Sequence, residues 1–261
     1  MKASTEMLLK ENLKALNLTH MASNLVSLVR QAQENGTIHE DFILALTEVE
    51  LQMRAESRLK RKLREAKFPL LKTLEQFDYG SAQTLDKRLI RELESGEYLG
   101  AHRNIIFVGK SGTGKTHLAT GLAVAACRQG INARFVTGCG LSMELVEAQS
   151  ERRLSRVIQK YARYGLLVVD ELGYVPFSKE SAELLFQVLA ERHERGSVII
   201  TSNLGFADWT QVFGDPTLTA TLLDRLTHKA HIINCTWESY RLKETLKARR
   251  GASEESKTAA R

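Results

Sequence analysis

Residues 109–116 form a glycine-rich phosphate-binding loop, and this feature restricts the possible folds of the chain more than any other. They read Gly-Lys-Ser-Gly-Thr-Gly-Lys-Thr and match the pattern GxxxxGK[ST]. The apolar run 105–108 precedes the loop, and a helical pattern begins directly after it at His117. A strand, a glycine-rich loop and a helix in this order turn backbone N–H groups and a helix N-terminus toward phosphates. The loop therefore predicts an α/β fold that binds a nucleotide.

Positions within the loop predict separate contacts. Lys115 is expected to bridge the β- and γ-phosphates, and the Thr116 hydroxyl is expected to coordinate Mg²⁺. His117 follows the loop directly and is expected to pack against it. With the acidic residue described next, the residues predicted to bind the nucleotide are Gly109, Lys110, Ser111, Gly112, Thr113, Gly114, Lys115, Thr116, His117 and Asp170.

Polar side chains follow two further apolar runs. Asp170 and Glu171 come directly after run 166–169, and Asn203 follows run 198–201. Carboxylates at the end of a central parallel strand lie beside the phosphate crevice. We expect Asp170 to hold Mg²⁺, Glu171 to activate a water for attack on the γ-phosphate, and Asn203 to orient that water. A kinase using this loop would not need Glu171 in that role, so the pair favours hydrolysis.

The distribution of apolar runs predicts the architecture. Short β-branched runs at 104–108, 133–136, 166–169, 198–201 and 231–234 alternate with helical patterns, which is typical of a five-stranded parallel sheet covered by helices on both faces. Residues 1–75 read as a small all-α N-terminal domain, and residues 76–249 as the nucleotide-hydrolysing domain. Residues 250–261 are polar and poor in apolar side chains, and are expected to form a basic disordered tail.

Charge and cysteine content narrow the class of partner and the compartment. The chain has 37 Lys and Arg against 31 Asp and Glu, a net charge of +6 that is compatible with a nucleic-acid partner. Positive charge is densest over 54–72. This stretch could form a DNA-binding surface or simply a helix face exposed to solvent. The residues of that stretch predicted to contact DNA are Lys60, Arg61, Lys62 and Arg64. The widely spaced cysteines and the lack of a membrane-length apolar run favour a cytoplasmic protein with no membrane partner.

Two arginines after the last polar motif are candidates for contacts with the γ-phosphate. Arg225 could reach a neighbouring subunit's nucleotide as an arginine finger, or could form an intramolecular pair with Asp224. Arg241 could sense the bound nucleotide, or could lie on the surface of a last helix. The sequence leaves both alternatives open. Phe77 and Tyr79, just ahead of the nucleotide-binding part, are candidates to flank the adenine.

The order of these motifs resembles that of AAA+ ATPases of the initiator and helicase-loader clade. Within the clade the chain is similar to the IstB-like ATP-binding proteins of insertion sequences, over nearly its whole length. The segment 171–177, Glu-Leu-Gly-Tyr-Val-Pro-Phe, favours that family over the DnaC-like replicative helicase loaders, which share the ATPase module and remain the alternative. No cysteine cluster occurs in the N-terminal part, where some helicase loaders have one.

The resemblance implies more than the motifs alone. It implies ATP and Mg²⁺ as cofactors and a homo-oligomer with ATP sites between subunits. It also implies assembly on duplex DNA and delivery of target DNA to an IstA-type transposase. The clade's extra helix would occupy 141–164. Arg152, Arg156 and Lys160 step by four and would share one face of it. The residues expected to line the DNA path are Arg152, Arg153, Arg156 and Lys160, a solvated face being the other reading.

Overall fold

The computed structural model describes residues 3–240, and the chain divides into two compact units, Met1–Arg61 and Lys62–Arg261. This division comes earlier than the boundary expected at residue 75. Residues between the two positions belong to the second unit because they pack there. Leu74 is 4% exposed, and its side chain lies so close to Gly121 that a Cβ there would be 2.7 Å from Leu74 Cδ2. The tail predicted for 250–261 lies outside the described residues.

The first unit is helical, as the sequence predicts. It contains α1 (Ala3–Ala15), α2 (Thr19–Asn35) and most of α3 (His39–Ala66), which continues into the second unit. The Asn35-Gly36 pair ends α2 as expected, because Gly36 adopts a left-handed φ of 63° and its N–H bonds to the Ala32 carbonyl. Helix α2 buries Met21, Ala22 and Leu25, while every residue of α1 retains some exposure.

A buried carboxylate fixes the start of α2 to α3. Glu50 on α3 is 3% exposed. It accepts a 2.8 Å hydrogen bond from the Met21 N–H and forms a 2.7 Å ion pair with Arg54. Arg54 in turn donates to the Asn17 carbonyl in the turn between α1 and α2. Burial by itself would raise the pKa of Glu50, but the Met21 N–H and Arg54 together hold that pKa below its ordinary value of 4.5.

Glu50 is therefore expected to stabilise the first unit in a pH-dependent way. A carboxyl with a lowered pKa stabilises fully above its unfolded value, and that stabilisation is lost as pH falls through the folded pKa. Glu50→Ala leaves the Met21 N–H and Arg54 without their acceptor, and should cost about 1–3 kcal/mol. Amide hydrogen exchange of α1 and α2 measures both effects. Protection should fall on acidification below pH 4.5 more steeply in the wild type than in Glu50→Gln.

The second unit is built on a five-stranded parallel sheet with strand order β2-β3-β4-β1-β5. All the predicted runs form strands, with bounds that differ by at most one residue at either end. The strands are β1 (Ile105–Gly109), β2 (Ala133–Thr137), β3 (Leu166–Asp170), β4 (Ser197–Ser202) and β5 (His231–Cys235). The order places β4 between the strand that leads to the phosphate loop and the strand that ends in Asp170.

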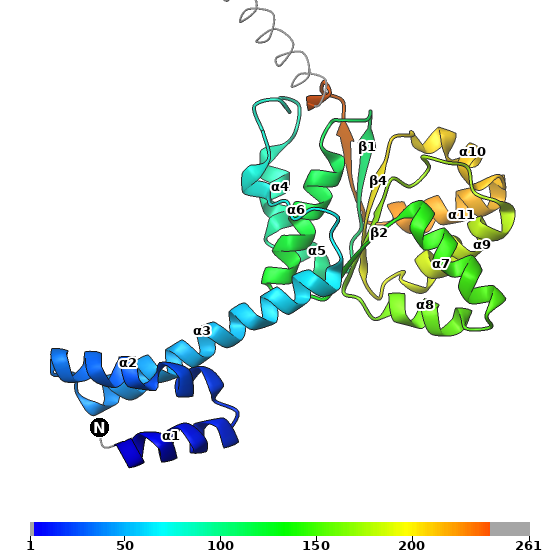
Figure 1. The fold of residues 1–261 in the computed structure, drawn as a ribbon. Coiled ribbons are helices and arrows are strands. Elements are labelled where there is room, and N and C mark those ends of the chain that lie inside the picture. The colour runs from blue at the N-terminus through cyan, green and yellow to red at the C-terminus, as the bar shows by residue number, and fades with distance from the viewer. Residues whose placement is uncertain (1–2, 241–261) are drawn as a thin grey trace, which may run out of the picture. The chain divides into compact units, whose positions relative to one another are not determined.

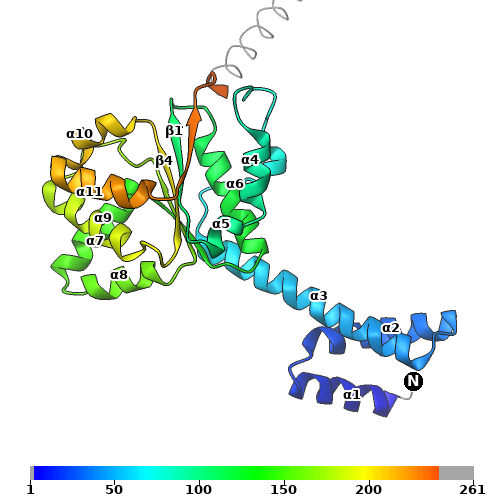
Figure 2. The same cartoon turned by 180° about the vertical axis from the view of Figure 1, so that it is seen from behind.

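Helices cover both faces of this sheet, as Figures 1 and 2 show from opposite sides. One face carries η1 (Leu74–Gln76), α4 (Lys87–Glu94), α5 (Glu97–Gly100) and α6 (Lys115–Arg128). The other carries α7 (Gly138–Ser150), α8 (Leu154–Ala162), α9 (Lys179–Glu191), η2 (Phe206–Asp208), α10 (Trp209–Phe213) and α11 (Pro216–Thr227). Within residues 3–240, each helix is too short or too polar to cross a membrane.

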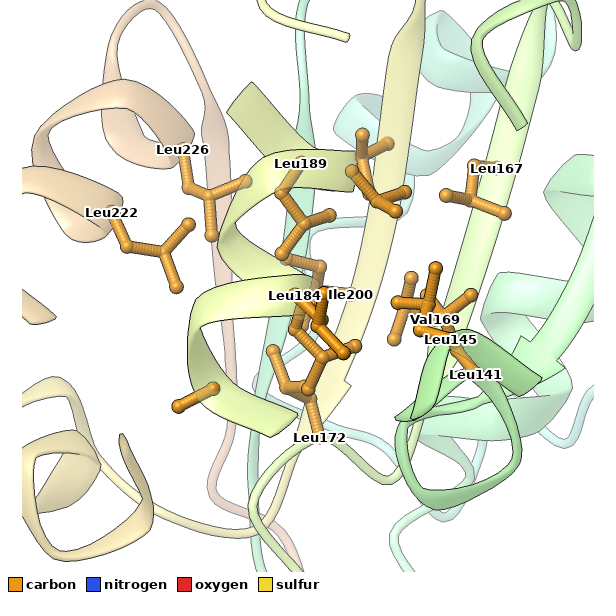
Figure 3. Close-up of a cluster of buried hydrophobic side chains, with 14 of the residues drawn as sticks. Leu141, Leu145, Leu167, Val169, Leu172, Leu184, Leu189, Ile200, Leu222 and Leu226 are labelled. Carbon is orange, nitrogen blue, oxygen red and sulfur yellow. The ribbon is translucent and has the colours of Figure 1, made fainter. Parts of the chain in front are cut away.

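A continuous apolar core joins the second face of the sheet to its helices (Figure 3). Leu167 and Val169 of β3 and Ile200 of β4 project from the sheet. Leucines from three helices meet them, namely Leu141, Leu145, Leu184, Leu189, Leu222 and Leu226. The strand positions lie in strands buried on both faces, and the helix positions lie on the apolar sides of their helices. Because both faces of the strands are buried, their sequences are unbroken apolar runs. The core holds the strand ends that carry the polar motifs.

The segment between β2 and β3 differs from the expected single helix over 141–164. It forms α7 and α8, separated by a break at residues 151–153 in which Arg152 has a left-handed φ of 56°. The expectation that Arg152, Arg156 and Lys160 share one helix face is therefore wrong, because Arg152 lies outside both helices. The four-residue spacing continues through the break, so the sequence pattern does not reveal it.

Candidate nucleotide-binding site

The phosphate loop joins β1 to α6 as its sequence predicts, and it is tightly enclosed. Gly114 caps α6 with a left-handed φ of 90°, and a Cβ there would lie 2.7 Å from Phe77 Cε2. A Cβ on Gly109 would lie 2.2 Å from the Cys235 carbonyl oxygen of the neighbouring strand β5. Side chains at either position would displace the loop, so glycine is required by packing as well as by backbone conformation.

Lys115 lies folded over the loop. Its Nζ donates to the Gly109 carbonyl at 2.7 Å and to the Lys110 carbonyl at 2.8 Å. Carbonyls at these distances fix the ammonium at the loop, beside the N-terminus of α6. That placement supports the predicted contact with phosphate oxygens, which would offer the same donors a charged acceptor.

Asp170 and Thr116 meet at the end of β3. Asp170 is buried, with 5% of the residue exposed. It accepts hydrogen bonds from the Thr116 hydroxyl, at 2.9 Å to Oδ1 and 3.1 Å to Oδ2. The end of β3 and the first turn of α6 thus bring a carboxylate and a hydroxyl together, and both groups can act as oxygen ligands of a metal ion. The two residues are 54 positions apart in the chain.

The Asp170 carboxylate and the Thr116 hydroxyl are suitable ligands for the predicted Mg²⁺. Magnesium prefers oxygen ligands and takes few of them from the protein when nucleotide phosphates and waters supply the rest. Among residues 3–240, no cluster of three or more His, Cys, Asp and Glu side chains is arranged as a metal site of its own.

Thr201 connects the two acidic residues, and sequence reasoning assigned it no role. This residue of β4 is fully buried. Its hydroxyl donates to Asp170 Oδ1 at 2.6 Å and accepts from the Glu171 N–H at 2.9 Å, while its carbonyl accepts from the Leu172 N–H at 2.9 Å. Glu171 has a left-handed φ of 56°, so these bonds stabilise an otherwise unfavourable backbone conformation. The adjacency of β3 and β4 produces this contact, and only a known strand order predicts it.

A cavity of about 640 Å³ lies beside the hydrogen bonds of Thr201 and is lined by Thr201 and Glu171. It brings together most of the residues predicted to act on the nucleotide: Ser111, Gly112, Thr113, Gly114, Lys115, Thr116, His117, Glu171 and Asn203. Glu171 and Asn203 come from the ends of β3 and the strand beside it, as predicted.

The segment before η1 and η1 itself form another wall of the cavity. His117 shares a 2.8 Å hydrogen bond with the Thr73 carbonyl, and its ring packs edge-on against Phe77 with centroids 5.3 Å apart. His117 thus packs against its surroundings as expected. Burial lowers the pKa of the imidazole, against the opposing effect of the Thr73 carbonyl. Phe77 lines the cavity, and Tyr79 packs edge-on against Phe77 with centroids 5.0 Å apart.

The residues that follow β5 support the loop from its other side. The Trp237 indole N–H donates to the Thr113 carbonyl at 2.8 Å, and the Tyr240 N–H donates to the Gly112 carbonyl at 3.0 Å. Both residues also line the cavity. No sequence motif marks Trp237 for this role, because its contact with Thr113 spans 124 residues of the chain.

Arg225 is placed away from this cavity. It lies on α11 with its guanidinium carbon 5.2 Å from the centre of the Phe186 ring of α9. It is not among the residues that line the cavity of its own chain, and its predicted contact, with the nucleotide of a neighbouring subunit, stays a prediction. Arg241 lies outside the described residues.

The residues predicted to contact DNA have different surroundings. Lys60, Arg61 and Arg64 lie on α3 with Lys62, and their side chains range from half-buried to exposed. On the α7–α8 segment Arg153 pairs with Glu147 and Glu151, and Lys160 pairs with Glu144 at 2.7 Å. Arg156 is exposed on α8, and Arg152 is exposed in the break before it. The exposed side chains can reach a ligand, so their contact with DNA stays a prediction. Arg153 and Lys160 also form ion pairs with nearby glutamates within the α7–α8 segment.

Thr201 is expected to position Glu171 and Asp170 for hydrolysis. Thr201→Val keeps the shape of the side chain but removes both hydroxyl bonds, and should lower the turnover rate on the order of 10–100-fold. ATP affinity, measured by titration with a fluorescent analogue, should change little because the phosphate loop is untouched. Thr201→Ser restores the hydroxyl and should recover most of the rate. Equal losses in Thr201→Ser and Thr201→Val would contradict the positioning role.

Comparison with known proteins identifies the family. The model of the IstB-like ATP binding protein family matches residues 11–248. The ATP-binding protein of insertion sequence IS21 from Pseudomonas aeruginosa is 38% identical over 90% of this chain and 89% of its own length. The corresponding protein of insertion sequence IS232 from Bacillus thuringiensis subsp. berliner is 34% identical over 90% of this chain and 94% of its own.

Solved structures share the fold at lower sequence identity. DnaA of Aquifex aeolicus bound to AMPPCP matches with a TM-score of 0.53 and 22% identity, over 69% of this chain and 56% of the DnaA chain. DnaI matches with a TM-score of 0.53 and 18% identity, over 62% and 90% of the two chains. The phosphate loop, the parallel sheet and the matched residues all indicate the same family and fold. The chain belongs to the IstB-like ATP-binding proteins of insertion sequences and has the AAA+ fold of the DnaA-like replication initiators.

Proposed function

We propose that this protein hydrolyses ATP, and that its ATP-bound oligomer assembles on duplex DNA and delivers target DNA to an IstA-type transposase. The observation that carries the hydrolytic part is the placement of Glu171. Its backbone is held by Thr201, which also binds Asp170, and the residue lines the same cavity as Lys115. A carboxylate held there is suited to accept a proton from water.

Each residue of the site has its own role in the proposed reaction. The loop N–H groups and Lys115 bind the β- and γ-phosphates, and Asn203 orients a water opposite the bond to be broken. Water attacks the γ-phosphorus and its proton passes to Glu171, while the bond from that phosphorus to the bridging oxygen breaks and yields ADP and phosphate. Thr116 and Asp170 would hold Mg²⁺, which neutralises charge on the phosphate oxygens.

The DNA-related part of the proposal rests on family membership and on charge. The relatives are named as ATP-binding proteins of insertion sequences, and the chain carries a net charge of +6. An ATPase that selects target DNA needs affinity for duplex DNA of any sequence. Positive charge supplies such affinity through release of counterions.

The experiment measures binding to duplex and single-stranded DNA with ATP, with ADP and without nucleotide, and then strand transfer by an IstA-type transposase. ATP-dependent binding to duplex DNA and stimulation of strand transfer would support the proposal. A preference for single-stranded DNA, together with binding to a hexameric helicase and no effect on strand transfer, would instead support the DnaC-like alternative.

The basic stretch of α3 is expected to bind DNA phosphates. Changing Lys60, Arg61, Lys62 and Arg64 to Gln should weaken binding to every duplex sequence alike. The slope of log affinity against log salt should shrink by roughly 0.9 for each phosphate that is no longer neutralised. Fluorescence anisotropy over a series of salt concentrations measures this slope. An unchanged slope would assign the stretch to a solvated helix face.

A further inference from the structure

A second cavity, of about 320 Å³, lies in the second unit and shares no residue with the nucleotide cavity. Its wall includes Asn132 and Arg134, just before and just after the first residue of β2. In the parallel register Ala133 pairs with Leu166, the first residue of β3, while Thr137 pairs with Asp170, the last. The second cavity therefore lies at the strand starts, and the nucleotide site lies at the strand ends.

This second cavity is strongly cationic. Its lining includes Lys62, Lys67, Arg134 and Lys160, with Glu65 as the one carboxylate among the lining residues. The Lys160 ammonium is paired with Glu144 at 2.7 Å, and Arg134 also interacts electrostatically with that carboxylate. Four cations therefore line the cavity against Glu65 in its lining and Glu144 beside it. Like charges gathered around a partly desolvated cavity focus a positive potential into it, and such a potential attracts anions.

The donors of the cavity are incompletely used. Arg134 Nη1 reaches the Glu65 carbonyl at a long 3.4 Å, and its buried Nε–H has no acceptor among the described residues. Lys62 donates to the Asn132 side chain, which leaves further ammonium protons to donate. A guanidinium beside two ammonium groups matches the several acceptor oxygens of a phosphate.

Further exposed cations lie on the helices that contribute to the cavity. Arg64 lies on α3 beside the lining residue Glu65, and Arg156 is exposed on α8. A single small anion would need only the cavity, whereas a chain of regularly spaced phosphates would use the cavity and the flanking cations together. This arrangement favours the backbone of a nucleic acid as the occupant.

We propose that the cavity formed by Lys62, Lys67 and Arg134 is a binding site for a phosphate of the DNA backbone. The inference rests on the proposed function and deepens it. It adds Lys67 and Arg134, which no sequence motif marks, to the DNA-binding surface. It also explains why the basic end of α3 and the α8 segment, distant in sequence, lie at one cavity.

The test compares three full-length variants in the presence of ATP, with a labelled duplex DNA of mixed sequence as probe. Lys67→Gln combined with Arg134→Gln should reduce the slope of log affinity against log salt by roughly 1.8, or about 0.9 for each residue. Glu65→Gln removes the opposing carboxylate and should tighten binding several-fold, a gain that misfolding cannot produce. Arg88→Gln, an exposed charge change on α4, should leave the slope unchanged. Basal ATPase activity without DNA should stay the same in all three.

Two further probes identify the source of the phosphate. If the double variant loses binding of inorganic phosphate but keeps the wild-type salt slope for DNA, the cavity holds free anions only and the proposal is overturned. If it keeps that slope but loses binding to the transposase, an acidic protein surface is the occupant and the proposal is again overturned. Failure of the wild type to bind duplex DNA under any nucleotide condition would reject the proposed function instead.

Discussion

Glu171→Gln is expected to bind ATP with wild-type affinity and to hydrolyse it slower by a factor on the order of 10²–10⁴, the contribution typical of a general base. The amide keeps the size of the side chain but cannot accept the proton of the attacking water. The backbone bond between the Glu171 N–H and Thr201 at 2.9 Å does not involve the side chain, so the geometry of the site should survive. Under the proposed function, the variant should form longer-lived complexes with duplex DNA because it remains in the ATP state.

Single-turnover hydrolysis and ATP titration, measured on the same preparation, separate the two effects. Lys115→Ala is the contrasting variant, because it removes the ammonium that lies over the loop and should weaken nucleotide binding itself. Asn203→Ala should lower the rate less than Glu171→Gln, since it disturbs the orientation of the water and leaves the base. Wild-type turnover by Glu171→Gln would show that another group accepts the proton.

The parts of the structure that the sequence predicts are those fixed by local pattern. The five strands match because β-branched apolar runs bounded by polar residues have few alternatives in an α/β chain. The phosphate loop matches because its glycines are needed both for the backbone turn and for the approach of Phe77 and Cys235. Asp170, Glu171 and Asn203 could be placed near the loop because strand ends of a parallel sheet meet at one edge.

The parts that the sequence does not predict depend on strand order or on contacts between distant segments. Thr201 acquires its role only when β4 lies beside β3. The break at Arg152 keeps the four-residue spacing of the helices around it, so periodicity passes through it unchanged. The second unit begins before residue 75 because Leu74 packs against Gly121 on α6, and no composition change marks that contact.

Arg225 is expected to act on the nucleotide of a neighbouring subunit, and its loss should reduce the rate of hydrolysis on the order of 10³-fold. Lys115, Asp170 and Glu171 already account for one subunit's share of the site, whereas Arg225 lies on α11 against Phe186 and does not line its own chain's cavity. Such an arginine stabilises charge that develops only in the transition state. Arg225→Ala should therefore bind ATP normally, and wild-type activity should rise more steeply than linearly with protein concentration.

The matched control is Asp224→Asn, on the same helix. If Arg225 served only to pair with Asp224, the two substitutions would have similar small effects on activity. If Arg225 acts across an interface, Asp224→Asn should retain most of the activity while Arg225→Ala loses it.

Mixing two inactive variants tests the action between subunits directly. Glu171→Gln retains Arg225 but lacks the base, and Arg225→Ala retains the base but lacks the arginine. In a mixed assembly some interfaces pair an intact Glu171 from one subunit with an intact Arg225 from its neighbour, so part of the ATPase activity should return, in proportion to the fraction of such interfaces. Duplex DNA should increase the recovery because it brings subunits together. If the variants co-assemble on DNA and the mixture stays inactive, Arg225 does not complete a neighbour's site. Hydrolysis would then have to be completed by groups of a single chain.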